Sequence, residues 1–97
     1  MNIAIFGLGL IGGSIGRSII KNTDNVVYGY DVDSESLLKA KMLKAINHTL
    51  KEEDYDKMDM VIVATNPKIA IEIINEVSPK LNDGAVVVDC CGNKRIV

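Results

Sequence analysis

The first sixteen residues constrain the fold of this chain more strongly than any other stretch. A short apolar run, Ile3–Phe6, is followed by three glycines in the spacing G-x-G-x-x-G. Apolar residues then recur at helical spacing, so the order predicts a strand, a tight turn and the start of a helix. The glycines are Gly7, Gly9 and Gly12, and the helical stripe is Ile15, Ile19 and Ile20.

Each glycine of this motif has a physical use. Gly7 allows the tight turn, Gly9 lets the backbone approach a pyrophosphate, and Gly12 lets the helix pack close to the strand. The free N–H groups at the helix start face the phosphates. We therefore predict a dinucleotide site here; the alternative is a turn that only tightens the strand–helix corner. The predicted cofactor-binding residues of this segment are Gly7, Leu8, Gly9, Leu10, Ile11 and Gly12.

A carboxylate follows the second predicted strand, Val26–Tyr30, at the position where a dinucleotide fold binds the adenosine ribose. Asp31 lies nineteen residues after Gly12, and no arginine occurs in the next four positions. Because a carboxylate repels a 2′-phosphate, the cofactor prediction is NAD rather than NADP. The alternative is that Asp31 caps the next helix, although Asp33 can do so instead.

The middle of the chain has weaker signals. A helix is predicted from Glu35 to roughly Ala45, and a short third strand near Ile46–His48. The charged stretch Lys51–Lys57 is predicted to be a solvated loop or a helical turn. The single histidine, His48, is interpreted as a surface or cofactor-rim residue. The apolar positions of this helix expected to share a face are Leu38, Met42 and Ala45.

The second half begins with a continuous apolar run, Met60–Ala64, which is typical of a central parallel strand. Thr65 and Asn66 follow at its carboxyl end, where open α/β sheets bind ligands, and both are predicted to bind the cofactor. Asn66 can also cap the next helix, with Pro67 in its first position. The last strand is predicted at Ala85–Asp89. The helix between them has a periodic apolar face of Ala70, Ile73, Ile74 and Val77.

This alternation predicts an α/β chain with a Rossmann-type, doubly wound parallel sheet of strand order 3-2-1-4-5. The 97 residues form one domain, with no sequence left for a sixth strand. A net charge of -2 gives no reason to expect nucleic acid, and no apolar run is long enough for a membrane span. The start is a strand rather than a signal peptide. The adjacent Cys90 and Cys91 are expected to be reduced, no metal set is present, and the predicted compartment is the cytoplasm.

Three segments resemble one enzyme family. Gly7–Ser14, with its double glycine and serine, is similar to the nucleotide-binding start of prephenate and arogenate dehydrogenases. Val61–Thr65 looks like the fourth strand of that family, and Val87–Lys94 looks like its D-x-x-[SG]-x-K segment. The resemblance covers nearly all of this chain, but only about the first half of a typical member.

The resemblance implies an NAD-dependent oxidative decarboxylation of prephenate or arogenate, on the route to tyrosine, by a homodimer. In this family the catalytic base is a histidine downstream of the lysine that corresponds to Lys94, and the helical domain for substrate binding and dimerisation also lies downstream. No catalytic residue is therefore assigned here, and the 97 residues alone are expected to be inactive. Gly92 stands where many members have a catalytic serine. Asn66 precedes Pro67 where the family more often has Thr-Pro directly.

Two other functions stay open at this point, and so does the oligomeric state. The chain could be another NAD-dependent reductase of the same fold, or a non-catalytic nucleotide-binding module. The strand Ala85–Asp89 is expected to have an unpaired outer edge. We expect the chain to associate with a second copy through this edge or through Cys90–Val97. The alternative is that the tail folds back over this edge.

Overall fold

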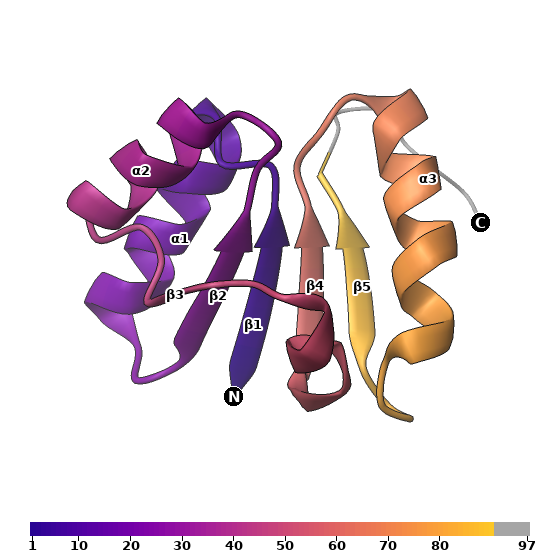
Figure 1. Cartoon of the computed structure of the whole chain (residues 1–97). Helices are drawn as coiled ribbons and strands as arrows, with labels where there is room; N and C mark the ends of the chain where they lie inside the picture. Colours follow the sequence, from indigo (N-terminus) through magenta and orange to yellow (C-terminus); the bar gives the residue numbers. More distant parts are fainter. Residues whose placement is uncertain (91–97) are drawn as a thin grey trace.

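The computed structural model describes residues 1–90 and contains one five-stranded sheet (Figure 1). The strand order is β3-β2-β1-β4-β5, as the sequence predicts, and every neighbouring pair is parallel. All carboxyl ends of the strands therefore lie at one edge of the sheet. The strands are β1 (Asn2–Phe6), β2 (Val26–Tyr30), β3 (His48–Thr49), β4 (Met60–Val63) and β5 (Val86–Asp89).

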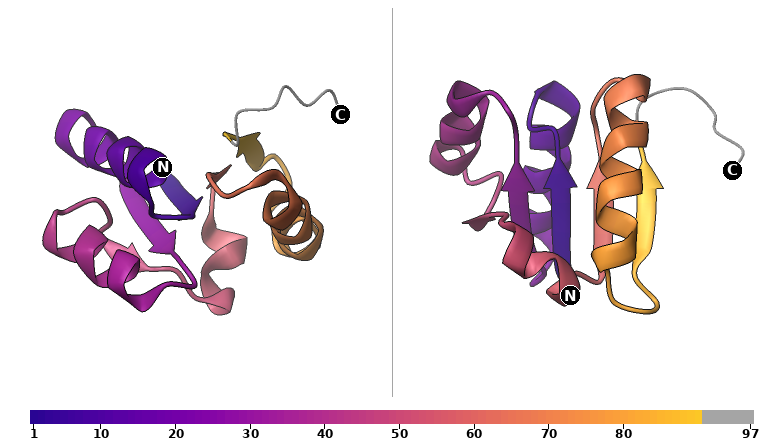
Figure 2. Two further views of the ribbon diagram at one scale, coloured as in Figure 1. Left: turned by 90° about the horizontal axis from the view of Figure 1, so that it is seen from above. Right: turned by 45° about the vertical axis from the view of Figure 1, so that its right-hand side comes forward.

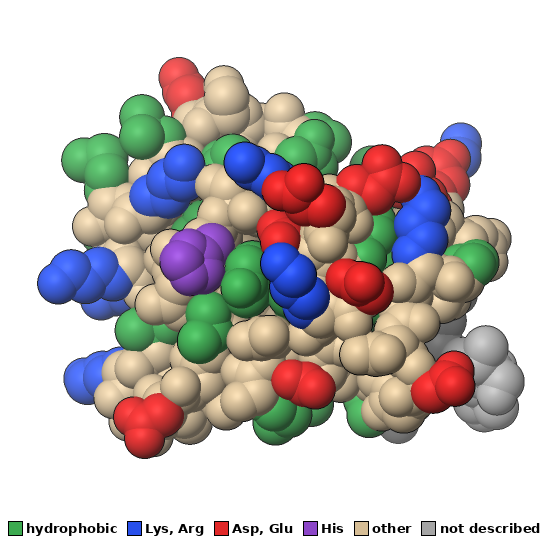
Figure 3. Space-filling view, turned by 60° about the horizontal axis from the view of Figure 1, so that its bottom comes forward, with side chains coloured by type: hydrophobic (Ala, Val, Ile, Leu, Met, Phe, Trp, Pro, Cys, Tyr) green, Lys and Arg blue, Asp and Glu red, His purple; other side chains and the backbone are tan. Residues whose placement is uncertain are grey.

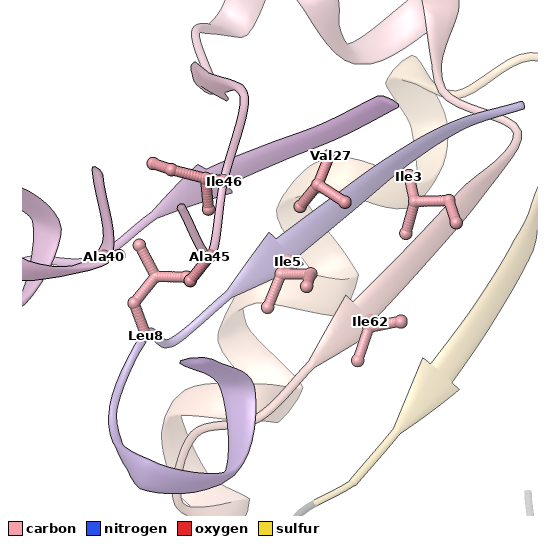
Figure 4. Packing of buried hydrophobic residues seen from close by; sticks show 8 residues of the cluster. All are labelled: Ile3, Ile5, Leu8, Val27, Ala40, Ala45, Ile46 and Ile62. Carbon is pink, nitrogen blue, oxygen red and sulfur yellow. The ribbon is translucent and has the colours of Figure 1, made fainter. Parts of the chain in front are cut away.

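Helices cover both faces of the sheet. Two helices pack on one face, around a core that includes the fully buried Ile5 (Figure 4). The opposite core, around Val63, is covered by the third helix and a 3₁₀ helix, and Figure 2 shows the third helix over β4 and β5. The helices are α1 (Leu10–Asn22), α2 (Ser34–Met42) and α3 (Pro67–Val77), with 3₁₀ helices η1 (Glu52–Lys57) and η2 (Ser78–Lys80).

Helix α2 ends three residues before the predicted boundary at Ala45. Lys44 adopts a left-handed conformation with φ 57°. The N–H of Ala45 then donates to the carbonyl of Ala40 at 2.8 Å, and the N–H of Lys44 to that of Lys41 at 3.2 Å. This is a Schellman ending, which usually has glycine at the left-handed position. Because lysine stands there instead, the sequence carries no stop signal.

The apolar residues predicted to share one face of this helix do not form its core-facing side. Leu38 is 58% exposed and Met42 is 74% exposed. The side that meets the core contains Ala40 and Leu37 instead, and Ala45 is buried only after the helix has ended. Apolar residues occur on several sides of α2, so periodicity alone could not identify the buried one.

The third strand lies slightly later than predicted and is short. His48 pairs with Tyr28 and Thr49 with Gly29, whereas Ile46 is a buried core residue before the strand. The charged stretch that follows forms η1, which agrees with the predicted helical turn. The sheet edge at β3 is therefore brief, which limits its use as a template for another chain.

The other edge strand, β5, pairs only with β4 among the residues that the structure describes. Its valines are unusually open: Val86 is 52% exposed, and Val87 and Val88 are each 36% exposed. The alternative that the tail folds back over this edge concerns Cys90–Val97, of which residues 91–97 lie outside the described part. Within residues 1–90 no helix has the length and apolar character needed to cross a bilayer.

Candidate nucleotide-binding site

A cleft of about 690 Å³ opens at the carboxyl ends of β1, β2 and β4. Two glycines of the motif line it, together with Asp31 and Thr65, so four of the predicted cofactor-binding residues come together. The glycines are Gly7 and Gly9. The remaining lining residues are Phe6, Tyr30, Val32, Leu50, Lys51, Glu52, Tyr55, Ala64, Ile69, Ile73 and Glu76.

Close contacts require two of the three glycines of the motif, and the third borders open space. Gly7 has φ +94°, and a Cβ there would lie 2.6 Å from the carbonyl oxygen of Ala64. A Cβ on Gly12 would lie 1.8 Å from the carbonyl oxygen of Gly7, so this glycine sets how closely α1 meets the loop. A Cβ on Gly9 would meet nothing within 4 Å. Gly9 thus borders open space in the cleft, where a ligand can approach the backbone.

The start of α1 has no side-chain cap. Its N-cap residue is Gly9, and the first turn contains no acidic residue. The first N–H groups of an α-helix have no partner within the helix, and they carry the positive end of its dipole. These groups of α1 therefore remain available to an anion beside the cleft.

Asp31 connects the second strand to this loop. One carboxylate oxygen accepts a hydrogen bond from the N–H of Leu8 at 2.7 Å, and the other accepts from the N–H of Asp33 at 2.9 Å. A carboxylate can accept about four hydrogen bonds, so two sites remain for a ligand. Asp33 caps α2 through the N–H of Glu35 and the hydroxyl of Ser36, as predicted, which leaves Asp31 to the cleft.

The other predicted residues lie around the cleft without lining it. The Asn66 side chain accepts a hydrogen bond from the N–H of Ile69 at 3.0 Å and caps α3. Leu8 is buried, whereas Leu10 and Ile11 project from the first turn of α1 with 89% and 59% exposure. His48 is exposed and lies against Tyr28, with the ring centroids 5.0 Å apart. Gly92 and the residues after it are outside the described part of the chain.

Sequence reasoning missed the far wall of the cleft. Tyr55 from η1 and Glu76 from α3 line it, although 21 residues separate them in sequence. Burial raises the pKa of Tyr55, and the nearby carboxylates of Glu76 and Glu52 raise it further. No local motif marks these residues, because the fold alone brings η1 and α3 to the same cleft.

Seen from the amino ends of the strands, acidic and basic side chains are interspersed over the surface (Figure 3). Within residues 1–90, the one ion pair that joins distant segments is Glu52 with Lys80, and the hydrogen bond from Lys80 lowers the pKa of Glu52. This pair connects η1 with the short helix η2 that follows α3. It therefore ties together the two segments that carry the far wall of the cleft.

Residues 2–93 match the model of a protein family described as NADP oxidoreductase coenzyme F420-dependent. A search of curated proteins finds no match to the chain.

Several solved dehydrogenases have a similar fold. Arogenate dehydrogenase from Synechocystis superimposes with a TM-score of 0.82 at 20% identity, over 92% of this chain and 32% of that one. Prephenate dehydrogenase from Aquifex aeolicus gives 0.78 at 30% identity, over 90% of this chain and 33% of that one. An NAD-binding semialdehyde dehydrogenase protein from Cupriavidus necator, solved with calcium and NAD, superimposes with a TM-score of 0.74 at 25% identity, over 91% of this chain and 32% of that one. The chain thus spans about a third of the length of these structures.

Proposed function

Because the chain belongs to the family described as NADP oxidoreductase coenzyme F420-dependent and has an NAD(P)-binding Rossmann-type fold, we propose that it binds NAD for a dehydrogenase. The residues fit such a cofactor. The open space at Gly9 and the uncapped N–H groups of α1 suit a pyrophosphate. The cofactor itself would supply hydride transfer, and the residues of this chain would bind and orient it.

The observation that carries the choice of NAD is the position of Asp31. Its carboxylate lines the cleft, and its hydrogen bond with Leu8 fixes it beside the glycine loop. From there it would accept hydrogen bonds from the ribose hydroxyls, and a 2′-phosphate would meet a like charge. In this proposal Thr65 borders the cofactor from the end of β4, and Asn66 contacts it through the amide group that the cap leaves unused.

Lys51 favours the competing choice of NADP, which the family description also mentions. Among the described residues that line the cleft it is the one cation, and it follows β3, the strand next to β2. A lysine there could offset the charge of a 2′-phosphate. The two cofactors therefore have to be compared directly.

The test is a titration of the chain with NAD and NADP by calorimetry. We expect NAD to bind more tightly than NADP. Asp31→Asn should weaken the binding of NAD by about 1–3 kcal/mol and reduce the difference in affinity between NAD and NADP. Asparagine keeps an oxygen that accepts from Leu8, so the loop should persist. Asp33→Asn is the matched control, because Asp33 caps α2 and does not line the cleft. Tighter NADP binding that falls with Lys51→Gln would assign the competing cofactor.

For the reaction, we propose oxidative decarboxylation of prephenate or arogenate in tyrosine biosynthesis. The segments Gly7–Ser14 and Val61–Thr65 and the 30% identity with the Aquifex aeolicus enzyme support this choice. The only histidine, His48, does not line the cleft, so we assign the base to a part of the enzyme beyond these 97 residues. NADH formation from prephenate, arogenate or a semialdehyde by the complete gene product distinguishes these substrates. The cytoplasmic location stays a prediction of the sequence.

We also propose that the chain forms a homodimer through β5. The exposed Val86–Val88 edge would accept a second copy by strand addition. Sedimentation at several concentrations should show association that Val87→Lys abolishes, since an added edge charge costs little in the monomer. A monomer at every concentration would contradict this arrangement.

A further inference from the structure

The far wall of the cleft holds one hydrogen-bond donor and one acceptor that have no partner within residues 1–90. The ring of Tyr55 packs edge-on against Phe6, with centroids 6.1 Å apart, which fixes the side chain at the wall. No hydrogen bond to its hydroxyl is found in that range, and the Glu76 carboxylate has neither a hydrogen bond nor an ion pair there. Polar groups so placed in a cleft are available to a ligand.

The charges around these groups define their roles. The pKa of Tyr55 is raised, first by burial and then by Glu76 and Glu52, so its hydroxyl stays protonated at neutral pH and can donate. The charge of Glu52 is offset by Lys80. Glu76 is therefore the acceptor at this wall that has no direct ion pair within residues 1–90.

Aliphatic side chains also line the cleft. Val32 follows Asp31 and is 87% exposed, and Ile69 of α3 is 40% exposed. Ile73 lies one turn further along α3 and also lines the cleft. Aliphatic side chains at a cleft suit the faces of a planar heterocycle, whose edge would then meet the polar wall.

From this arrangement we infer that the cleft selects adenine among purine bases, with Glu76 as the specificity-determining residue. Glu76 accepts a hydrogen bond from the exocyclic amino group of the base, and the Tyr55 hydroxyl donates to a ring nitrogen. The inference rests on the proposed binding of NAD. Hypoxanthine has a carbonyl oxygen in place of the amino group, so it would bring an acceptor to a carboxylate that only accepts.

The experiment compares NAD with nicotinamide hypoxanthine dinucleotide by calorimetry on the full chain. We expect NAD to bind about tenfold more tightly, as the loss of a hydrogen bond to a charged group implies. Glu76→Gln should reduce this ratio to about twofold or less, because a glutamine amide can also donate. Tyr55→Phe should weaken both dinucleotides to a similar extent, since a hydroxyl donates or accepts as the base requires.

The matched control is Glu72→Gln, which removes the same charge one turn earlier on α3, from an exposed residue that does not line the cleft. It should leave the ratio unchanged. Equal binding of the two dinucleotides by the unmodified chain, or an unchanged ratio in Glu76→Gln, would overturn the inference while leaving NAD binding intact. Failure of NAD itself to bind would instead remove the proposed function, and the inference with it.

Discussion

Helices α1 and α3 begin at the same edge of the sheet, one after β1 and the other after β4, but their first turns are completed differently. Asn66 caps α3 by accepting from the N–H of Ile69, and Pro67 occupies its first turn. Helix α1 begins at Gly9 with no side-chain hydrogen bond and no acidic residue. One helix start is satisfied by its own sequence, and the other leaves its donors to an outside partner.

The difference contrasts a helix start that its own side chain caps with one whose first N–H groups have no side-chain partner among the described residues. A capped start contributes about 1 kcal/mol to stability wherever it occurs. An uncapped start forgoes that contribution and gains a place for an anion. Both helix starts border the cleft, but the one that forgoes a cap is the one beside Asp31, which accepts a hydrogen bond from the N–H of Leu8.

The largest expected effect on stability comes from adding a side chain where α1 lies against the glycine loop. Gly12→Ala should destabilise the protein by about 3 kcal/mol, because the new Cβ would lie 1.8 Å from the carbonyl oxygen of Gly7. Urea denaturation measures this change. The control is Gly13→Ala, since a Cβ there would lie 3.6 Å from its nearest neighbour, the carbonyl oxygen of Leu8. This variant should be as stable as the parent or up to about 1 kcal/mol more stable; equal effects of the two substitutions would contradict the close approach.

A second substitution gives α1 the kind of start that α3 has. Gly9→Ser supplies a hydroxyl that can cap the first turn, so stability should change by less than about 0.5 kcal/mol. Affinity for NAD should fall about tenfold, because the side chain enters the open space and competes for the N–H groups. Calorimetry and urea denaturation on the same sample separate the two effects. Unchanged NAD binding would show that the pyrophosphate does not use this turn.

The smallest effect is expected at the start of α3. Asn66→Ala should cost about 1 kcal/mol of stability through the lost cap, whereas Asn66→Ser keeps an accepting oxygen and should cost a few tenths. Thermal or urea unfolding measures both. Because Asn66→Ser also removes the amide group that we propose contacts the cofactor, NAD affinity should fall while stability stays nearly unchanged. Unchanged NAD affinity would leave Asn66 with a capping role alone.

Local patterns were sufficient for most of the fold. The glycine spacing, the apolar runs Val26–Tyr30 and Met60–Ala64, and the period of α3 each predict an element from neighbouring residues alone. Because parallel strands with helical connections have few right-handed arrangements, the strand order follows from the order of the elements. The boundary of α2 was missed because Lys44 takes a conformation that usually indicates glycine.

The candidate site was predictable only where its residues are adjacent to a motif. Gly7, Gly9, Asp31 and Thr65 follow strand ends, which the sequence identifies, and all four line the cleft. Tyr55 and Glu76 look like ordinary members of a charged turn and an amphipathic helix. Their proximity arises because the fold brings η1 and α3 to one cleft, which is a property of tertiary structure and has no local signal.

The glycines outside the motif bear on where this chain can be lengthened. A Cβ on Gly16 would lie 2.1 Å from the carbonyl oxygen of Ala45, and one on Gly29 would lie 2.3 Å from the side chain of Ile46. The weakly patterned segment at 45–46 is thus confined between α1 and β2 as closely as atoms allow, and an inserted residue there would displace both. The turn at Asp83–Gly84 has no such neighbour, since a Cβ on Gly84 meets nothing within 4 Å, so a tag or linker for immobilising the domain belongs at that turn.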